Sequence, residues 1–174
     1  MEEGAIVYID YDLFEVDSGK LIETTREETA KSNDVHEESR NYEPLCVTIG
    51  AGALIPGFEE SLEEAEVETD YDIEISADKA YGERDSGAIE MLGPQQLARQ
   101  VRDPDNLQVG GPVEIGGRKG TLIMFRAGRA RIDFNHELAG KSLRYNYRIT
   151  KVIEEKDEMV MTLLKMSTGS DDFE

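Results

Sequence analysis

Apolar and polar residues alternate with a period of two in several stretches of this chain, which is the pattern of half-buried β-strands. Over 5–13 the odd-numbered positions are apolar, and the alternation returns over 71–75 and, most cleanly, over 143–149. Shorter runs at 20–24 and 45–49 add two further strands. The pattern therefore predicts an α+β fold that is mainly antiparallel β.

Two helices are predicted where a proline opens a stretch of helical spacing. Pro56 follows a glycine-rich turn, and proline is tolerated in the first turn of a helix. Phe58, Leu62 and Ala65 then fall on one face at i, i+4 and i+7. A second helix is predicted over 94–100. Spacing alone indicates no more for 49–62 than a turn and a helix that cover a core.

The polar stretch 26–43 holds almost no apolar residues, so it predicts a mobile loop that can include a turn of helix. The segment between Gly82 and Ile132 has its own character, with short strands expected at 112–115, 121–125 and 130–132. Glycine-containing turns at 116–117 and 127–128 join these strands. In the tail, 159–166 carries an apolar stripe that is compatible with either an edge strand or a short helix.

The charge excludes some functions. The chain has 38 acidic and 19 basic residues, a formal charge of −19, which repels phosphate backbones and makes nucleic-acid binding improbable. Self-repulsion favours a monomer, and screening in concentrated salt would relieve it, so we expect a salt-tolerant archaeal source. We find no run of 18 apolar residues and no basic, apolar leader. A cytoplasmic protein without a membrane segment is therefore expected.

Cysteine and histidine usage indicates neither a disulfide nor a metal site. Cys46 is the single cysteine, and its place in an apolar run predicts a buried strand thiol rather than a nucleophile. His36 and His136 lack cysteine partners and paired spacing, so a structural zinc site has no support. We expect no metal and no cofactor.

Three ordered segments carry a more specific signal. They are 49–62 (IGAGALIPGFEESL), 75–84 (ISADKAYGER) and 132–149 (IDFNHELAGKSLRYNYRI). The first two resemble the signatures of the FKBP-type peptidyl-prolyl cis-trans isomerases. The third is similar to the Asn-His-x-Leu-Ala-Gly element of the SlyD-like and archaeal branch, as is 42–45 (YEPL). The resemblance covers residues 4–153.

This resemblance implies a curved antiparallel sheet wrapped on a short helix, with a small β-rich insert-in-flap domain. The isomerase domain would comprise 1–85 and 132–153, the insert 86–131, and an acidic C-terminal extension 154–174. The implied activity is isomerisation of X-Pro bonds in proline-containing or unfolded polypeptides. The alternative is a holdase-type chaperone whose isomerase site is vestigial. A purely acidic interaction scaffold would explain the charge but not the motifs.

The resemblance also assigns a prolyl pocket. Its floor would be Leu54, Ile55 and Phe58, and the Ile55 amide would donate a hydrogen bond to the peptide. The walls would be Tyr11, Leu45 and Tyr145, Tyr81 would offer its hydroxyl to a substrate carbonyl, and Ile22 and Phe134 would close the rim. Two positions depart from the family: Glu23 stands where an aspartate is common, and Phe58 stands where many members have tryptophan.

In the SlyD-like branch the insert is associated with binding unfolded chains, and the insert of this chain is rich in apolar residues. They outnumber what so small a unit can bury, so part of the set is expected to line an exposed, adaptable groove. The predicted groove residues are Ile89, Met91, Leu92, Leu97, Val113, Leu122 and Met124.

Overall fold

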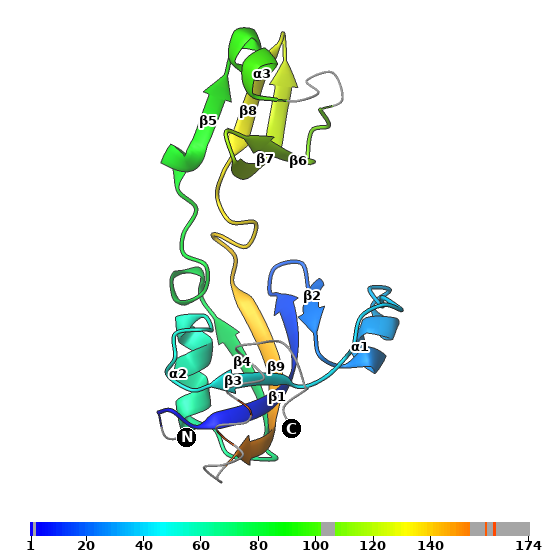
Figure 1. The fold of residues 1–174 in the computed structure, drawn as a ribbon, viewed down its shortest axis with the longest axis vertical. Helices are drawn as coiled ribbons and strands as arrows, with labels where there is room; N and C mark the ends of the chain where they lie inside the picture. Colours follow the sequence, from blue (N-terminus) through cyan, green and yellow to red (C-terminus); the bar gives the residue numbers. More distant parts are fainter. Residues whose placement is uncertain (2, 102–106, 154–158, 160–161, 163–174) are drawn as a thin grey trace. The chain divides into compact units, whose positions relative to one another are not determined.

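The chain forms two compact units in the computed structural model, which describes residues 1, 3–101, 107–153, 159 and 162. The first unit consists of residues 1–80 and 141–174, and the second of residues 81–140. Each unit has its own antiparallel sheet (Figure 1). Within the described ranges no helix is both long and apolar enough to cross a membrane.

The first unit is a five-stranded sheet with one helix packed against it. The strands run in the order β2-β1-β9-β4, and β3 also pairs with β1. All of these pairings are antiparallel, as the alternating pattern predicted. The elements are β1 (Ile6–Glu15), β2 (Leu21–Thr24), α1 (Glu27–Ser32), β3 (Leu45–Thr48), α2 (Pro56–Glu64), β4 (Asp70–Ile75), a short 3-10 turn (Ala77–Lys79) and β9 (Leu143–Ile153).

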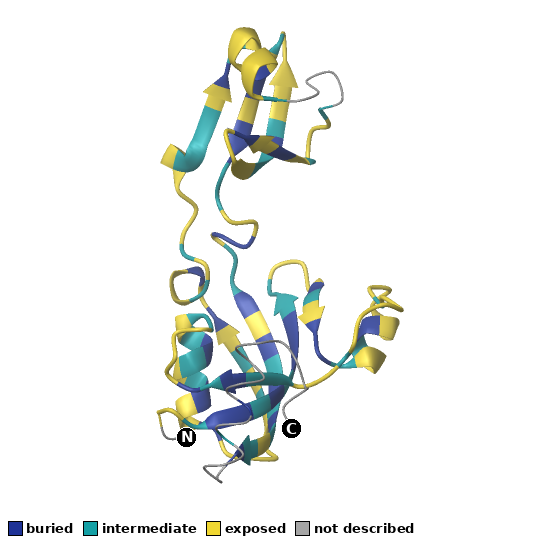
Figure 2. Ribbon diagram, viewed as in Figure 1, coloured by how far each residue is buried: buried dark blue, intermediate teal, exposed yellow. Residues whose placement is uncertain are grey.

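The core of this unit lies between α2 and the inner face of the sheet. Helix α2 begins at Pro56, as predicted, and buries Phe58 and Leu62 against the strands. The buried residues gather along β1 and β9, the two central strands (Figure 2). Each fully buried apolar side chain of this size stabilises the fold by about 1.5–3 kcal/mol. The predicted α+β fold with a curved antiparallel sheet on a short helix is confirmed.

Burial adds two local features to the first unit. The polar stretch 26–43 contains a helix, α1, because Ala30 is fully buried and Glu27 and Lys31 form an i, i+4 ion pair of 2.6 Å. On β1, Ile6 and Asp12 are buried as well, although they lie at the alternate positions of the strand. Asp12 is buried because a polar network, described below, satisfies its carboxylate.

The second unit is a four-stranded sheet in the order β5-β8-β7-β6. Helix α3 covers one face, and the turn between β6 and β7 has Gly116 and Gly117 at positive φ, which suits a two-residue hairpin. A 3-10 turn (Ser86–Ala88) leads into the unpredicted strand β5. The elements are β5 (Ile89–Leu92), α3 (Pro94–Gln100), β6 (Pro112–Ile115), β7 (Arg118–Arg126) and β8 (Arg129–Asp133).

The chain segments with which the second unit begins and ends are joined by hydrogen bonds. The Asp85 amide donates to the side-chain oxygen of Asn135 at 2.9 Å, and the Asn135 amide nitrogen donates back to the Asp85 carbonyl at 2.9 Å. The Gly140 amide donates to the Gly82 carbonyl at 2.8 Å. Arg84 pairs with the buried carboxylate of Asp133. We call residues 82–85 and 133–140 the neck.

The carboxylate of Asp133 makes the neck sensitive to acid. Burial by itself pushes the pKa of Asp133 upward, but hydrogen bonds from Arg84 and Asn135 outweigh it and hold that pKa below its usual value of 3.8. A lowered folded-state pKa adds stability above pH 4, which is lost as the pH falls through the lowered pKa.

We expect the hydrogen-exchange protection of strands β5 to β8 to fall between pH 5 and pH 2, and Asp133→Asn to remove much of that fall. The exposed carboxylate of Asp17 provides the control, because Asp17→Asn should leave the pH profile unchanged. Equal pH profiles for wild type and Asp133→Asn would contradict the assigned role of this carboxylate.

The prediction of an edge strand or helix over 159–166 lies outside the described residues, apart from Met159 and Thr162. Thr162 is buried.

Candidate active site

Three aromatic rings from three separate elements of the first unit meet on the inner face of the sheet. Phe58 of α2 lies on Tyr145 of β9, with ring centroids 4.2 Å apart and planes inclined by 19°. Tyr11 of β1 stands 5.7 Å from Tyr145 and 6.3 Å from Phe58. All three are buried, and tilted or offset ring pairs of this kind stabilise a cluster beyond the area they bury. The sequence-predicted residues Tyr11, Phe58 and Tyr145 are thus brought together.

The strand register explains why the two tyrosines share a face. Tyr145 lies opposite Leu13, and Tyr147 lies opposite Tyr11 in the β1–β9 pair. Directly paired residues point to the same side of an antiparallel sheet, as do residues two apart on one strand. Tyr11 and Tyr145 are therefore diagonal neighbours on the face that α2 covers.

Leu54 and Ile55 form the approach to α2 and are half-buried. The Ile55 carbonyl accepts hydrogen bonds from the Phe58 amide at 3.0 Å and the Glu59 amide at 3.1 Å, which starts the helix. The Leu54 amide lies 3.4 Å from the Glu59 carboxylate, which reaches back from the first turn. These bonds hold the turn against the helix, and among the described residues the Ile55 amide has no acceptor.

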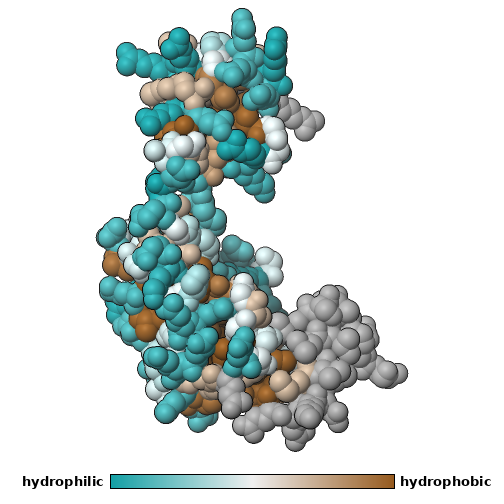
Figure 3. Space-filling model, turned by 90° about the vertical axis from the view of Figure 1, so that its left-hand side faces the viewer, coloured by the Kyte–Doolittle hydropathy of each residue, from teal (hydrophilic) through white to brown (hydrophobic). Residues whose placement is uncertain are grey.

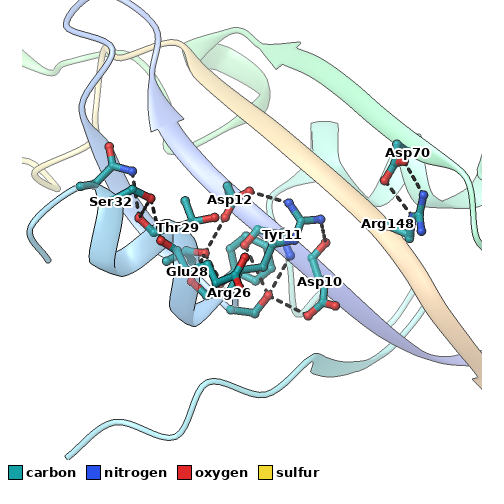
Figure 4. A network of polar contacts seen from close by, with 12 residues as sticks. Asp10, Tyr11, Asp12, Arg26, Glu28, Thr29, Ser32, Asp70 and Arg148 are labelled. Atoms are coloured by element: carbon teal, nitrogen blue, oxygen red, sulfur yellow. Dashed lines mark hydrogen bonds and ion pairs between the residues drawn. The ribbon is translucent and has the colours of Figure 1, made fainter. Parts of the chain in front are cut away.

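A network of hydrogen bonds holds the backbone of Tyr11 (Figure 4). The Tyr11 amide donates to the Thr25 hydroxyl at 2.9 Å, and the Tyr11 carbonyl accepts from the Thr25 amide at 3.0 Å. Thr25 in turn donates to Asp10 at 3.1 Å. Next to it, the buried carboxylate of Asp12 accepts from Thr24 at 2.5 Å and from the Arg26 guanidinium. The backbone that carries the Tyr11 ring therefore has little freedom.

The predicted residues on β2 and β3 lie at the margin of the first unit. Ile22 and Leu45 are half-buried, and Glu23 is exposed. The Glu23 carboxylate pairs with Arg40 at 3.1 Å, and Arg40 also donates to the Thr24 carbonyl at 3.2 Å. Glu23 thus has a partner of its own, and whether it takes the part of the family's aspartate stays a prediction.

Two predicted pocket residues, Tyr81 and Phe134, belong to the second unit. Tyr81 is 39% exposed, and its ring stacks on His136 with centroids 4.2 Å apart and planes inclined by 2°. Phe134 packs against the core of the second unit, and the Arg118 guanidinium lies 3.9 Å from its ring centroid. Their parts in the pocket remain predictions.

Sequence reasoning missed Tyr147. Its buried ring stands edge-on to Phe58 at 5.1 Å and stacks on Tyr71 at 5.1 Å, while its hydroxyl lies 2.6 Å from the Ser61 hydroxyl. Burial, the largest influence, raises the pKa of Tyr147 above its usual 10.0, so the hydroxyl stays protonated and joins α2 to β9. The signal was present in the sequence, because Tyr147 is two residues from Tyr145 and so shares its face.

Cys46 lies half-buried in β3. Burial raises the pKa of its thiol above the usual 9.0, which keeps the thiol protonated at neutral pH and makes it a poor nucleophile. This agrees with the expected structural role.

The predicted groove of the second unit divides into core and surface. Leu92, Leu97, Val113 and Leu122 are buried in the unit's own core, so they were wrongly placed in an exposed groove. The core is larger than predicted because α3 covers one face of the sheet and closes over these side chains. Met91 and Met124 remain exposed, at 53% and 37%, and Ile89 is half-buried.

A curved antiparallel sheet that holds an aromatic cluster against one short helix defines the class of FKBP-like domains. The sequence profile described as FKBP-type peptidyl-prolyl cis-trans isomerase matches residues 1–97. The short-type peptidyl-prolyl cis-trans isomerase of Methanocaldococcus jannaschii is 36% identical over 152 residues, which is 87% of this chain and 94% of that protein.

Two bacterial SlyD proteins are also similar to this chain. The FKBP-type peptidyl-prolyl cis-trans isomerase SlyD of Helicobacter pylori is 28% identical over 87% of this chain and 82% of its own. SlyD of Escherichia coli is 30% identical over 70% of this chain and 62% of its own. A crystal structure of a peptidyl-prolyl cis-trans isomerase from Pseudomonas syringae aligns with 88% of this chain and 65% of its own, at a TM-score of 0.41 and 13% identity.

The chain therefore belongs to the FKBP-type peptidyl-prolyl cis-trans isomerase family and is SlyD-like. It is a peptidyl-prolyl cis-trans isomerase, and its substrates are proline-containing polypeptides.

Thr25 provides a test of how Tyr11 is held. Thr25→Ala removes the acceptor of the Tyr11 amide, so we expect the free energy of unfolding to fall by about 1 kcal/mol. A looser Tyr11 ring should also lower kcat/KM by roughly fivefold in a prolyl-peptide assay. Thr25→Ser keeps the hydroxyl and should restore both values. If Thr25→Ala lost stability but kept kcat/KM, the network would stabilise the fold without positioning Tyr11.

Proposed function

We propose that the cluster of Tyr11, Phe58 and Tyr145, bordered by Leu54 and Ile55, binds the prolyl ring of the substrate. The observation that carries this proposal is the meeting of three buried rings from β1, α2 and β9 beside the turn that opens α2. Such a surface is apolar, and aromatic faces suit a saturated ring.

The chemistry requires no nucleophile and no general base. The barrier to rotation about the X-Pro bond, about 18–20 kcal/mol, arises from amide resonance. Resonance places negative charge on the carbonyl oxygen and positive charge on nitrogen, so an apolar surround disfavours the planar form relative to the twisted one. In the proposed pocket the three aromatic rings provide this apolar environment, and the Ile55 amide holds the peptide by one hydrogen bond.

We also propose that the second unit binds unfolded segments of the same clients. Support comes from the apolar side chains that its core leaves at the surface, since exposed methionines adapt to many partners. Met91 is 53% exposed, Phe125 41% and Met124 37%. Binding at a second place on one chain raises the effective concentration of a proline near the pocket. The formal charge of −19 supports a soluble monomer.

The neck offers a natural place to separate the two activities. Removing 86–131 and joining Asp85 to Ile132 keeps Arg84, Asp133 and Asn135, which hold the neck together. We expect this deletion to keep turnover of a prolyl tetrapeptide. It should slow catalysis of a proline-limited protein refolding reaction by roughly a hundredfold, because the client is no longer held.

The double variant Met91→Ser and Met124→Ser, in the full chain, is the control for disturbance of the neck and should show the same contrast in weaker form. Refolding catalysis that survives both changes would contradict the client-binding role. A wild type with no tetrapeptide turnover, but with client binding, would favour a holdase with a vestigial site.

A further inference from the structure

The charge of this protein is confined to one of its two units. Residues 81–140 contain eight basic and eight acidic residues, so the second unit has no formal net charge. The remaining 30 acidic and 11 basic residues carry the whole −19 of the chain. Acidic polypeptides are therefore repelled by the first unit but not by the second.

The second unit also has a sheet face of which part is exposed to solvent. Strand pairing places Met91 of β5 and Met124 of β7 directly opposite Arg131 of β8. Directly opposite residues share a face, so these three side chains form one row across the sheet. The next row along β8 pairs Arg129 with Arg126. All five residues are exposed, and we call this surface the open face.

The opposite face of the same strands is apolar and buried. Ala130 and Ile132 of β8 alternate with the two arginines and lie in the core that α3 covers. The space-filling view shows apolar side chains at the surface of this unit among hydrophilic ones (Figure 3). The strand register thus places the open face on the solvent side of the sheet. Its central row nevertheless contains two apolar side chains, Met91 and Met124, on either side of Arg131.

The open face is basic. Arg126, Arg129 and Arg131 form no ion pair with any carboxylate of the described residues, in contrast to Arg84 and Arg118, which pair with Asp133 and Glu90. Asp133 is the acidic residue of β8, and its charge is already matched by Arg84 and hidden from solvent. Three guanidinium groups that have no ion pair within the described part of the chain therefore lie in two neighbouring rows of the sheet.

We propose that the open face binds extended polypeptide segments in which acidic side chains lie beside apolar ones. This inference rests on the proposed client binding by the second unit and names the client chemistry. The methionines would take up the apolar side chains, and the arginines would pair with carboxylates, for which the guanidinium fork is suited. The open face would thereby capture the acidic segments that the first unit repels.

The test uses two fluorescently labelled, proline-free peptides and the full-length protein. One peptide alternates leucine with glutamate, and the other has glutamine in place of every glutamate. The absence of proline keeps the prolyl pocket out of the measurement. Fluorescence anisotropy gives Kd for wild type, for the double variant Arg129→Gln and Arg131→Gln, and for Arg99→Gln, an exposed arginine on α3 that provides the matched control.

We expect wild type to bind the glutamate peptide more tightly than the glutamine peptide, by a margin that shrinks as KCl is added. The double arginine variant should raise Kd for the glutamate peptide by about tenfold and leave the glutamine peptide unchanged. Arg99→Gln should change neither value. Met91→Ser with Met124→Ser should weaken binding of both peptides.

Three results would overturn the proposal. Equal affinity for the two peptides, unaffected by the arginine changes, would remove the acidic preference while client binding stands. Displacement of the glutamate peptide by a short single-stranded RNA at lower concentration would make the open face a nucleic-acid site. A concentration-dependent dimer that the arginine changes abolish, without binding of either peptide, would make the occupant a second copy of this chain and would refute client binding as well.

Discussion

Replacing Phe58 with alanine is expected to lower kcat/KM for prolyl peptides by about a hundredfold, the largest catalytic effect of any single change in the first unit. The Phe58 side chain is 1% exposed and lies against three tyrosine rings, at centroid distances of 4.2 Å, 5.1 Å and 6.3 Å. Its removal takes away the floor of the proposed pocket and lets Tyr11 and Tyr145 shift. The same change should cost about 3–5 kcal/mol of unfolding free energy, because it leaves a cavity in the core.

The stability loss must be separated from the catalytic loss. Leu62 provides the control, since it lies one turn further along α2, is fully buried and does not belong to the ring cluster. Leu62→Ala should cost about 2–5 kcal/mol but leave kcat/KM of the folded protein unchanged. The assay is run at a temperature where both variants are folded, as checked by circular dichroism. Phe58→Ala with full activity would show that the prolyl ring binds elsewhere.

Gly57→Ala is expected to destabilise the protein by about 1–3 kcal/mol, although alanine is the better helix former by about 1 kcal/mol. Gly57 does not have a positive φ, so its backbone does not demand glycine. The reason is space: a Cβ at this position would stand 2.5 Å from a methyl carbon of Ile75 and 3.3 Å from Cβ of Lys79. Ile75 is buried in β4 and cannot swing aside.

The clash should also reduce catalysis, because α2 must move away from β4 and carries Phe58 with it. Glu63→Ala, at an exposed position of the same helix, is the control and should change stability by no more than about 0.5 kcal/mol. In a double-mutant cycle, Ile75→Ala should relieve part of the cost of Gly57→Ala, so that the two changes together cost less than their sum. Strictly additive costs would show that Ile75 is not what excludes a side chain here.

Periodicity predicted most strands of this chain because each strand has one buried face, and a two-residue period is then imposed by the pleat. Pro56 and Pro94 predicted the first residues of α2 and α3 for an equally local reason, the missing amide that only a first turn tolerates. The bounds of the short helix α1 were not predicted, because the helix is held by the burial of one residue, Ala30, which no local sequence pattern indicates.

The proposed pocket shows the same difference between local and tertiary information. The resemblance to the family indicated Tyr11, Phe58 and Tyr145, because motif residues recur as recognisable types at set places in a family. The network of Asp12, Thr24, Thr25 and Arg26 was not predicted, since the hydrogen bonds that join it to β1 connect residues more than ten positions apart in the sequence. Tertiary structure alone made Asp12 a buried carboxylate.

The sequence by itself determined the class of fold, the start of α2 and the family of isomerases, and it indicated the aromatic residues of the proposed pocket, because these depend on local backbone chemistry and on motif spacing. Only the tertiary structure decided which apolar residues of the second unit lie in its core and which stay exposed, since α3 covers one face of the sheet and not the other. It also decided that position 57 has no room for a side chain, because that depends on how closely α2 approaches β4.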